Sequence, residues 1–331
     1  MGSLPRRLLW RARCLFDRKK ASQPGLFVHI PKTSGMSFVD ALAQRQSVVY
    51  AYGRSAPRTS DSVQENIYDH YRPDKLFRTT HGDPVWLAGH FRVFKHAELV
   101  ECRRIITFVR DPVDRVISHF NHAISYISSD GIDIDSFINQ PINQNVQSKY
   151  LDGMPRDCIG FVGVTEHNDA SLAIINHELG LDLSQQYTNR NTTKTLDRER
   201  LDEGLYRRIR ELNWRDLELY DWAVANLETR YRFISEGKPW CHGVYTVTQD
   251  AELCGIAFYA ASDEAVTVNI LRNGVHLKTL TADLRYRQPL PAIFPRRQRI
   301  AFRLPVQQPY SDYDVVVAST GQRLNFSAAI A

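Results

Sequence analysis

A lysine, small hydroxyl residues and one glycine follow each other in residues 31–37 (Pro-Lys-Thr-Ser-Gly-Met-Ser), between a short apolar run and a helical pattern. Backbone N–H groups at the start of a helix bind anions, and small hydroxyl side chains add donors without blocking a ligand. Lys32 would bring a mobile positive charge to a phosphate oxygen. The segment therefore predicts a phosphate cradle, and an ordinary turn between a strand and a helix is the alternative.

The order of residues in this segment differs from the loop of the P-loop NTPases. That loop places its lysine directly after the second glycine of G-x-x-x-x-G-K-[ST], whereas Lys32 precedes Gly35. A nucleoside triphosphate is therefore not the first ligand to expect. A nucleotide kinase remains an alternative enzyme class, because it would also need a phosphate site between a strand and a helix.

A second candidate for anion binding begins at Arg110, which ends another apolar run, and includes Ser118, two turns along the helical pattern that follows. A guanidinium and a hydroxyl in these places would together hold a phosphate. The alternative is that Arg110 simply pairs with Asp111 or Asp114. Two anion sites at neighbouring strand ends would suit a ligand that carries two separated phosphates.

The elements that must position these residues alternate between apolar runs and helical patterns from about residue 26 to 235, which is typical of a parallel sheet covered by helices. Asp111 suits the N-cap of one helix and Pro112 its first position. An apolar stripe continues that helix through Val113, Val116, Ile117, Phe120, Ile124 and Ile127. We expect strands at 26–30, 104–109, 161–164 and 231–234, and helices at 35–42, from 112 onward, from 166 to Gly180 and across 197–228.

The pattern changes after Gly237, where helical stripes give way to alternating strands such as 265–271 and 314–317, with hairpin signals at Asn273-Gly274 and Thr320-Gly321. The expected fold is α/β, a parallel sheet flanked by helices with a P-loop-like phosphate cradle, followed by an all-β sandwich module. The predicted divisions are a basic amphipathic tail at 1–25, the sheet-and-helix domain at 26–236 and the β module at 237–331.

The net charge of +5 belongs to the first 25 residues, which hold a net of +6 and leave −1 for the remainder. This tail is expected to be either a solvated terminus or a short amphipathic helix in peripheral contact with an anionic membrane surface. Nucleic-acid binding is not expected, since the body of the chain has no basic surplus. No apolar run reaches roughly 20 residues and no signal peptide is evident, so we expect a cytoplasmic protein.

The five scattered cysteines show no C-x-x-C spacing, which argues against a disulfide framework and against a zinc site. No H-E-x-x-H motif or paired carboxylates occur either. We therefore expect no metal.

Residues 29–37 resemble the 5′-phosphosulfate loop of the PAPS-dependent sulfotransferases, whose typical form in the branch of heparan sulfate 2-O-sulfotransferase and its bacterial relatives is H-I-P-K-T-G-G-T-S. Residues 108–118 (FVRDPVDRVIS) resemble the same family's 3′-phosphate motif. The resemblance continues through residues 89–90, 145–151 and 161–166, and covers about 25–235. Ser34 and Met36 depart from the typical glycine and threonine, so Ser34 keeps a small side-chain donor whereas Met36 would offer only its backbone N–H.

The resemblance implies a sulfuryl transfer from PAPS, with PAP as product, to a hydroxyl of a carbohydrate, either a glycan or a glycolipid. Lys32 would contact the 5′ phosphate and the bridging oxygen. Arg110 and Ser118 would hold the 3′ phosphate, and the similar late loop would add Arg190, Thr192 and Lys194. The 5′ phosphate would be wrapped by Thr33, Ser34, Gly35, Met36 and Ser37. The β module is similar to small modules appended to bacterial glycan-modifying enzymes at residues 265–268, 282–285, 301–305 and 321–324.

The acceptor hydroxyl needs a base, and His90 matches the family's glycine-histidine segment. An imidazole with a pKa near 6.5 is mostly neutral near pH 7 and accepts a proton there. The alternative for His90 is a hydrogen-bonded structural histidine. His29 is expected to fix the geometry of the loop, and His81 and Glu166 are reserve bases. Besides a kinase, a noncatalytic glycan-binding protein that works through its β module is the other alternative function.

Overall fold

A computed structural model of the chain describes residues 23–76, 85–126, 133–184, 196–287, 290 and 292–327. The predicted tail at 1–25 therefore lies, up to residue 22, outside the described residues. The chain divides into two compact units. The first unit comprises Met1–Arg92, Ile106–Leu151 and Val162–Glu228, and the second comprises Val93–Ile105, Asp152–Phe161 and Thr229–Ala331.

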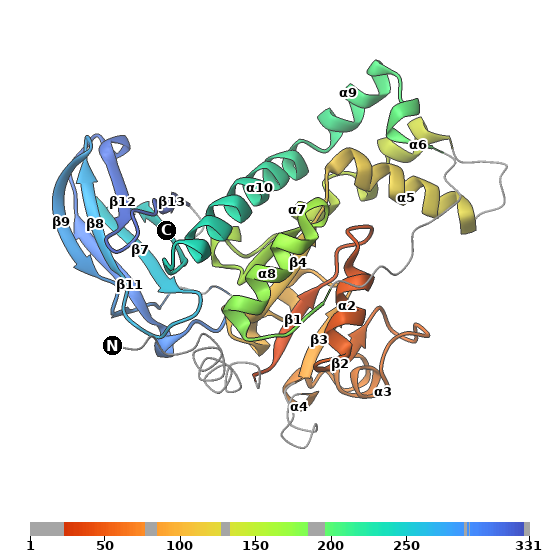
Figure 1. Ribbon diagram of the computed structural model, residues 1–331, viewed down its shortest axis with the longest axis horizontal. Coiled ribbons are helices and arrows are strands. Elements are labelled where there is room, and N and C mark those ends of the chain that lie inside the picture. Colours follow the sequence, from red (N-terminus) through yellow and green to blue (C-terminus); the bar gives the residue numbers. More distant parts are fainter. Residues whose placement is uncertain are drawn as a thin grey trace, which may run out of the picture. The chain divides into compact units, whose positions relative to one another are not determined.

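The first unit contains a five-stranded parallel sheet flanked by helices (Figure 1), which confirms that part of the predicted fold. Its strand order is β2-β3-β1-β4-β5. The strands are β1 (Gly25–Val28), β2 (Ser47–Ala51), β3 (Val85–Gly89), β4 (Ile105–Val109) and β5 (Phe161–Val164). Every residue of β1, β3, β4 and β5 is buried, as the continuous apolar runs of a covered parallel sheet require.

Helix α5 (Pro112–Tyr126) begins directly after β4 and confirms the predicted strand-to-helix junction. The Asp111 carboxylate accepts the N–H groups of Val113 (2.9 Å) and Asp114 (3.1 Å), so it caps the helix. The apolar stripe of α5 enters a buried cluster with α6 and α9, and only Ile127 of the predicted stripe lies outside the described residues. The other helices of four or more residues are α2 (Gly35–Ala43), α4 (Pro73–Leu76), α6 (Ile134–Asn139), α7 (Val146–Leu151), α8 (Asn168–Leu179), α9 (Glu203–Leu212), α10 (Trp214–Ser235) and the π-helix Gln64–Asp69, and α3 is the single turn Asp61–Val63.

The region after residue 197 corrects two expectations. The single helix predicted across 197–228 is two helices, because the backbone of Asn213 is non-helical between α9 and α10. The strand predicted at 231–234 is wrong, since α10 continues to Ser235. A short aromatic and β-branched run fits a buried helix end as well as a strand, and here Phe233 packs its ring against Trp240 at 6.0 Å.

The second unit contains a mixed five-stranded sheet, of order β10-β11-β7-β6-β13, and an antiparallel three-stranded sheet, of order β12-β8-β9. This confirms a β-rich C-terminal region. Asn273 and Gly274 both have positive φ (51° and 76°), as the predicted hairpin turn between β8 and β9 requires. The strands are β6 (Cys241–Val247), β7 (Glu252–Tyr259), β8 (Thr267–Arg272), β9 (Val275–Thr281), β10 (Leu284–Arg285), β11 (Arg299–Pro305), β12 (Tyr313–Val317) and β13 (Asn325–Phe326).

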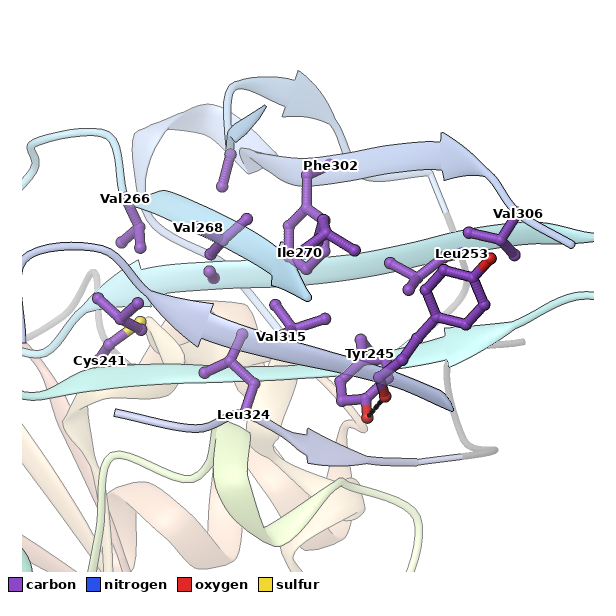
Figure 2. Close-up of a cluster of buried hydrophobic side chains, with 14 of the residues drawn as sticks. Cys241, Tyr245, Leu253, Val266, Val268, Ile270, Phe302, Val306, Val315 and Leu324 are labelled. Carbon is purple, nitrogen blue, oxygen red and sulfur yellow. Dashed lines mark hydrogen bonds between the residues drawn. The ribbon is translucent and has the colours of Figure 1, made fainter. Parts of the chain in front are cut away.

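Side chains from both of these sheets fill one buried core (Figure 2). Leu253 and Phe302 enter it from the mixed sheet, and Ile270 and Val315 from the antiparallel sheet. Each such side chain contributes about 1.5–3 kcal/mol to folding by leaving water. The Tyr245 hydroxyl lies in the same core and is satisfied by donating to the carbonyl of Tyr313 at 2.9 Å.

Among the helices that the described residues form, none has the length and apolar composition to cross a membrane.

Candidate functional site

The predicted chemistry gathers where three neighbouring strands of the parallel sheet end. The sheet order places β1 between β3 and β4, so the loop after β1 has His90 on one side and Arg110 on the other. The backbone confirms this closeness, because the His29 N–H donates to the carbonyl of Gly89 at 2.9 Å. Ligands of open α/β sheets bind at this carboxyl edge.

The loop at 31–34 has an unusual backbone. Lys32 and Ser34 have φ of 70° and 59°, in the left-handed region that non-glycine residues rarely adopt. Thr33 between them is fully buried, and its hydroxyl donates to the carbonyl of Ile30 at 2.9 Å. The Thr33 side chain therefore closes the turn and is not available to a ligand.

Thr165, which follows β5, fastens this loop to the sheet. Its hydroxyl lies 2.9 Å from the carbonyl oxygen of Thr33 and 3.0 Å from that of Val109. One side chain thus ties the loop to the end of β4. Strain such as that at Lys32 persists only where the surrounding contacts hold it, and Thr165 supplies such a contact.

Helix α2 begins at Gly35 with conditions that favour an anion. Its N-cap, Ser34, is exposed and makes no capping hydrogen bond with its side chain, and its first turn has no acidic residue. Neither the N-cap side chain nor the first turn of α2 therefore compensates the positive end of the helix dipole. Gly35 also lets the helix approach the ring of His29, because a Cβ there would lie 2.2 Å from His29 Cδ2.

Gly35→Ala is expected to lower the free energy of unfolding by about 1–3 kcal/mol, because the buried His29 ring must move. Chemical denaturation measures this change. The control is the double variant His29→Ala/Gly35→Ala, in which the clash is absent. Its loss of stability should be clearly smaller than the sum of the two single losses, and strict additivity would contradict the packing explanation.

Arg110 reaches toward the loop from the end of β4. One terminal nitrogen of its guanidinium lies 3.5 Å from the carbonyl oxygen of Lys32, and its Nε lies 3.9 Å from a carboxylate oxygen of Glu166. The alternative partners Asp111 and Asp114 are occupied by Arg198, at 3.2 and 3.5 Å. Arg110 is therefore directed across the strand ends and not toward the carboxylates at the start of α5.

Gln147 holds the backbone of Arg110 in place. Its side-chain amide accepts the Arg110 N–H at 2.8 Å and donates to the Arg110 carbonyl at 2.9 Å. Gln147 is itself fully buried, and its N–H donates to the Asp216 carboxylate at 3.0 Å. Gln147 belongs to the segment 145–151 in which the sequence resembles the sulfotransferases, but residue spacing alone could not reveal its contact with the Arg110 backbone. Thr165 could have been found by the rule that functional side chains follow strand ends.

Lys32 and Arg110 form a region of positive charge at this edge. Burial, together with the charge of Arg110, lowers the pKa of Lys32. Burial also lowers the pKa of His122 on α5, to which the charge of Lys32 adds. Ser118 is half-buried on α5, one turn before His122, so the two residues lie on the same side of the helix. The edge carries concentrated positive charge that a bound anion would relieve.

One ring nitrogen of His90 is bonded to the backbone, and the other has no hydrogen-bond partner among the residues that the structure describes. Its Nδ1 lies 2.6 Å from the carbonyl oxygen of His29, and a carbonyl only accepts, so Nδ1 carries the proton. Nε2 of the neutral ring then has an available lone pair. Partial burial lowers the pKa of His90, and the hydrogen bond to His29 opposes this shift, although the residue as a whole is exposed. The arrangement keeps His90 neutral and able to accept a proton.

No family model, curated protein or solved structure matches this chain.

His29 and Met36 belong to a network beside His90. His29 Nδ1 lies 2.9 Å from the hydroxyl of Tyr52, and burial lowers the pKa of His29 to about 3 and raises that of Tyr52 to about 12. The Met36 sulfur accepts from Tyr52 (3.5 Å) and from Arg58 (3.2 Å). The Met36 side chain is thus turned into this network, which leaves its backbone N–H for a ligand.

The reserve bases and the predicted residues of the late loop add little to the description of the site. Both carboxylate oxygens of Glu166 are engaged, one by the N–H of Asp111 (3.1 Å) and the other by the hydroxyl of Tyr220 (3.3 Å). His81 lies outside the described residues, as do Arg190, Thr192 and Lys194. Within the described part of the chain, no three His, Cys, Asp or Glu side chains are grouped to hold a metal ion.

Proposed function

We propose that this protein is a PAPS-dependent sulfotransferase that moves a sulfuryl group to a hydroxyl of a carbohydrate. The observation that carries the proposal is the approach of the Arg110 guanidinium to within 3.5 Å of the Lys32 carbonyl oxygen. Two anion-binding elements from neighbouring strands thereby lie side by side. PAPS carries its 3′ phosphate and its 5′ phosphosulfate on one ribose, which fits two such adjacent elements.

In this proposal the loop after β1 is a P-loop-like cradle for the 5′ phosphosulfate. The backbone N–H groups of Thr33 and of residues 34–37, the hydroxyl of Ser34 and the ammonium of Lys32 are its donors. Arg110 and Ser118 bind the 3′ phosphate, with Arg190, Thr192 and Lys194 as further contacts. The resemblance noted in the sequence supports this assignment.

The transfer is a single in-line displacement. The acceptor oxygen forms a bond to sulfur while the bond from sulfur to the bridging oxygen of the 5′ phosphate breaks, so PAP leaves with the negative charge. Lys32 stabilises that charge as it develops. His90 Nε2 takes the proton of the acceptor hydroxyl, and the Nδ1–H bond to the His29 carbonyl orients the ring for this task. Fixed Lys, Arg and backbone donors then fill the role that magnesium has in kinases.

The proposal is tested by the thermal unfolding of the full chain with PAP, with AMP and with ATP-Mg. PAP at a hundred times its Kd should stabilise the protein by about 2.7 kcal/mol, and AMP, which lacks the 3′ phosphate, should bind at least tenfold more weakly. Arg110→Gln should remove the difference between PAP and AMP. Stabilisation by ATP-Mg without any by PAP would instead support the kinase.

A further inference from the structure

The second unit contains a stretch of sequence with an extreme charge. Residues 284–303 include six arginines, at 285, 287, 296, 297, 299 and 303, and no aspartate or glutamate. The body of the chain outside the first 25 residues has a net charge of −1, so this stretch is a local exception. Its arginines lie on β10, on β11 and on the connection between them.

Arg285 and Arg299 are direct partners across the antiparallel pair β10 and β11. Directly opposed residues have Cβ atoms about 4.5–5.5 Å apart, and like charges in such pairs are destabilising. Both side chains are exposed, and neither forms an ion pair with any residue that the structure describes. Arg303, further along β11, differs because Glu252 lies 3.7 Å from it.

The backbone that leads into β11 is strained. Arg296, Arg297 and Gln298 have φ of 55°, 52° and 68°, three consecutive non-glycine residues in the left-handed region. Each costs roughly 1–2 kcal/mol. Hydrogen bonds hold the turn: the Gln298 N–H donates to the Pro295 carbonyl (3.0 Å), and the Arg296 guanidinium donates to the Ala282 carbonyl (2.7 Å).

This turn keeps two more arginines beside the opposed pair. The Tyr286 N–H donates to the Gln298 carbonyl at 2.8 Å, so the pairing of β10 and β11 continues one residue past the strand ends. Arg287 and Arg297 come next on the two segments, and both are exposed. Neither has an ion pair within the described residues. Four exposed arginines without an ion pair to the described residues thus lie on two paired backbone segments, and we call them the arginine strip (Arg285, Arg287, Arg297 and Arg299).

We propose that the arginine strip binds a linear acidic polysaccharide through its sulfate or carboxylate groups. All four cations are arginines, whose planar guanidinium bonds such groups with two parallel hydrogen bonds. The neighbouring aromatics Tyr286 and Phe294 are buried, so the strip offers no stacking platform of the kind that binds single-stranded nucleic acid. The choice of a polysaccharide rests on the proposed function, whereas the anion-binding strip itself does not.

The test measures the affinity of the full chain for a labelled heparin oligosaccharide at about 0.1 M salt, without PAPS or PAP. Arg285→Gln/Arg299→Gln should weaken binding by about tenfold or more, and should flatten its salt dependence. It should melt no lower than the original protein, because it relieves a like-charge contact. The matched control Arg232→Gln/Arg323→Gln removes two exposed arginines elsewhere in the same unit, and should stay within about twofold.

The basic residues at 1–25 are present in both variants, so their contribution cancels. Heparin should also protect the four arginines of the strip (Arg285, Arg287, Arg297 and Arg299) from phenylglyoxal modification and leave Arg232 and Arg323 reactive. Equal losses of heparin affinity in the two double variants, or protection confined to the arginines of residues 1–25, would contradict the proposal that the arginine strip is the binding site. Tighter binding to phosphatidylserine vesicles or to duplex DNA, if it is lost in Arg285→Gln/Arg299→Gln, would contradict the proposal that the ligand is a polysaccharide. Failure of PAP to bind would affect only the proposed enzyme activity.

Discussion

Replacing Lys32 with alanine should lower kcat for sulfuryl transfer from PAPS by about 10²–10³-fold. Lys32 has a restrained backbone, with φ of 70°, and its pKa is lowered by burial and by Arg110. The ammonium is therefore half-buried and near a second positive charge, so it is stabilised when negative charge develops on the bridging oxygen. Transfer of radiolabelled sulfate to a mixed glycan acceptor measures kcat.

The affinity for PAP should fall less than kcat, because backbone N–H groups of the loop and the start of α2 still bind the 5′ phosphate. Lys238→Ala is the matched control, since Lys238 is exposed and pairs with Glu236 at 2.6 Å in the second unit. It should leave both quantities unchanged. A kcat for Lys32→Ala within about threefold of that of the original protein would contradict the proposal that Lys32 stabilises the leaving group.

His90→Ala should lower kcat by about 10²–10⁴-fold, the usual contribution of a general base, while the affinity for PAP changes by less than about twofold. The imidazole is held by Nδ1, 2.6 Å from the His29 carbonyl oxygen, and by ring contacts with His29 and Tyr52, whereas Nε2 has no hydrogen-bond partner among the described residues. His276→Ala removes an exposed histidine of β9 and should be neutral. Near-normal turnover in His90→Ala would show that His90 is not the general base and would support its interpretation as a hydrogen-bonded structural histidine.

The pH dependence of kcat/KM gives a second measurement on His90. Only the neutral ring accepts a proton, so activity should rise with pH through the pKa of His90 and be level above it. Burial places that pKa below the usual value of about 6.5. Full activity is therefore expected at pH 7, with the loss beginning only on acidification below about pH 6.5. This acid limb should be absent from the residual activity of His90→Ala.

The sequence predicted a parallel sheet and three of its five strands, at 26–30, 104–109 and 161–164, because their signals are local, but it did not predict β2 or β3. Continuous apolar runs such as Ile105–Val109 mark strands buried on both faces, and Asp111-Pro112 marks the start of α5 through capping that involves three consecutive residues. It misassigned residues 231–234 because a run of four residues has no period long enough to separate a strand from a helix end. The sequence analysis also did not identify the arginines of residues 284–303, because the net charge of −1 over residues 26–331 does not reveal a local excess of positive charge.

The candidate site likewise has features that the sequence predicted and features that only the folded structure shows. The types and order of residues were sufficient to nominate the loop at 31–37, Arg110 and His90, since these depend on strand ends that the sequence marks. Only the folded chain decided that Arg198 takes Asp111 and leaves Arg110 free to turn toward Lys32, that Gln147 clasps the Arg110 backbone, and that His90 carries its proton on Nδ1. These contacts join residues 37 to 87 positions apart, and their choice of partner depends on which side chains the packed sheet brings within 3–4 Å.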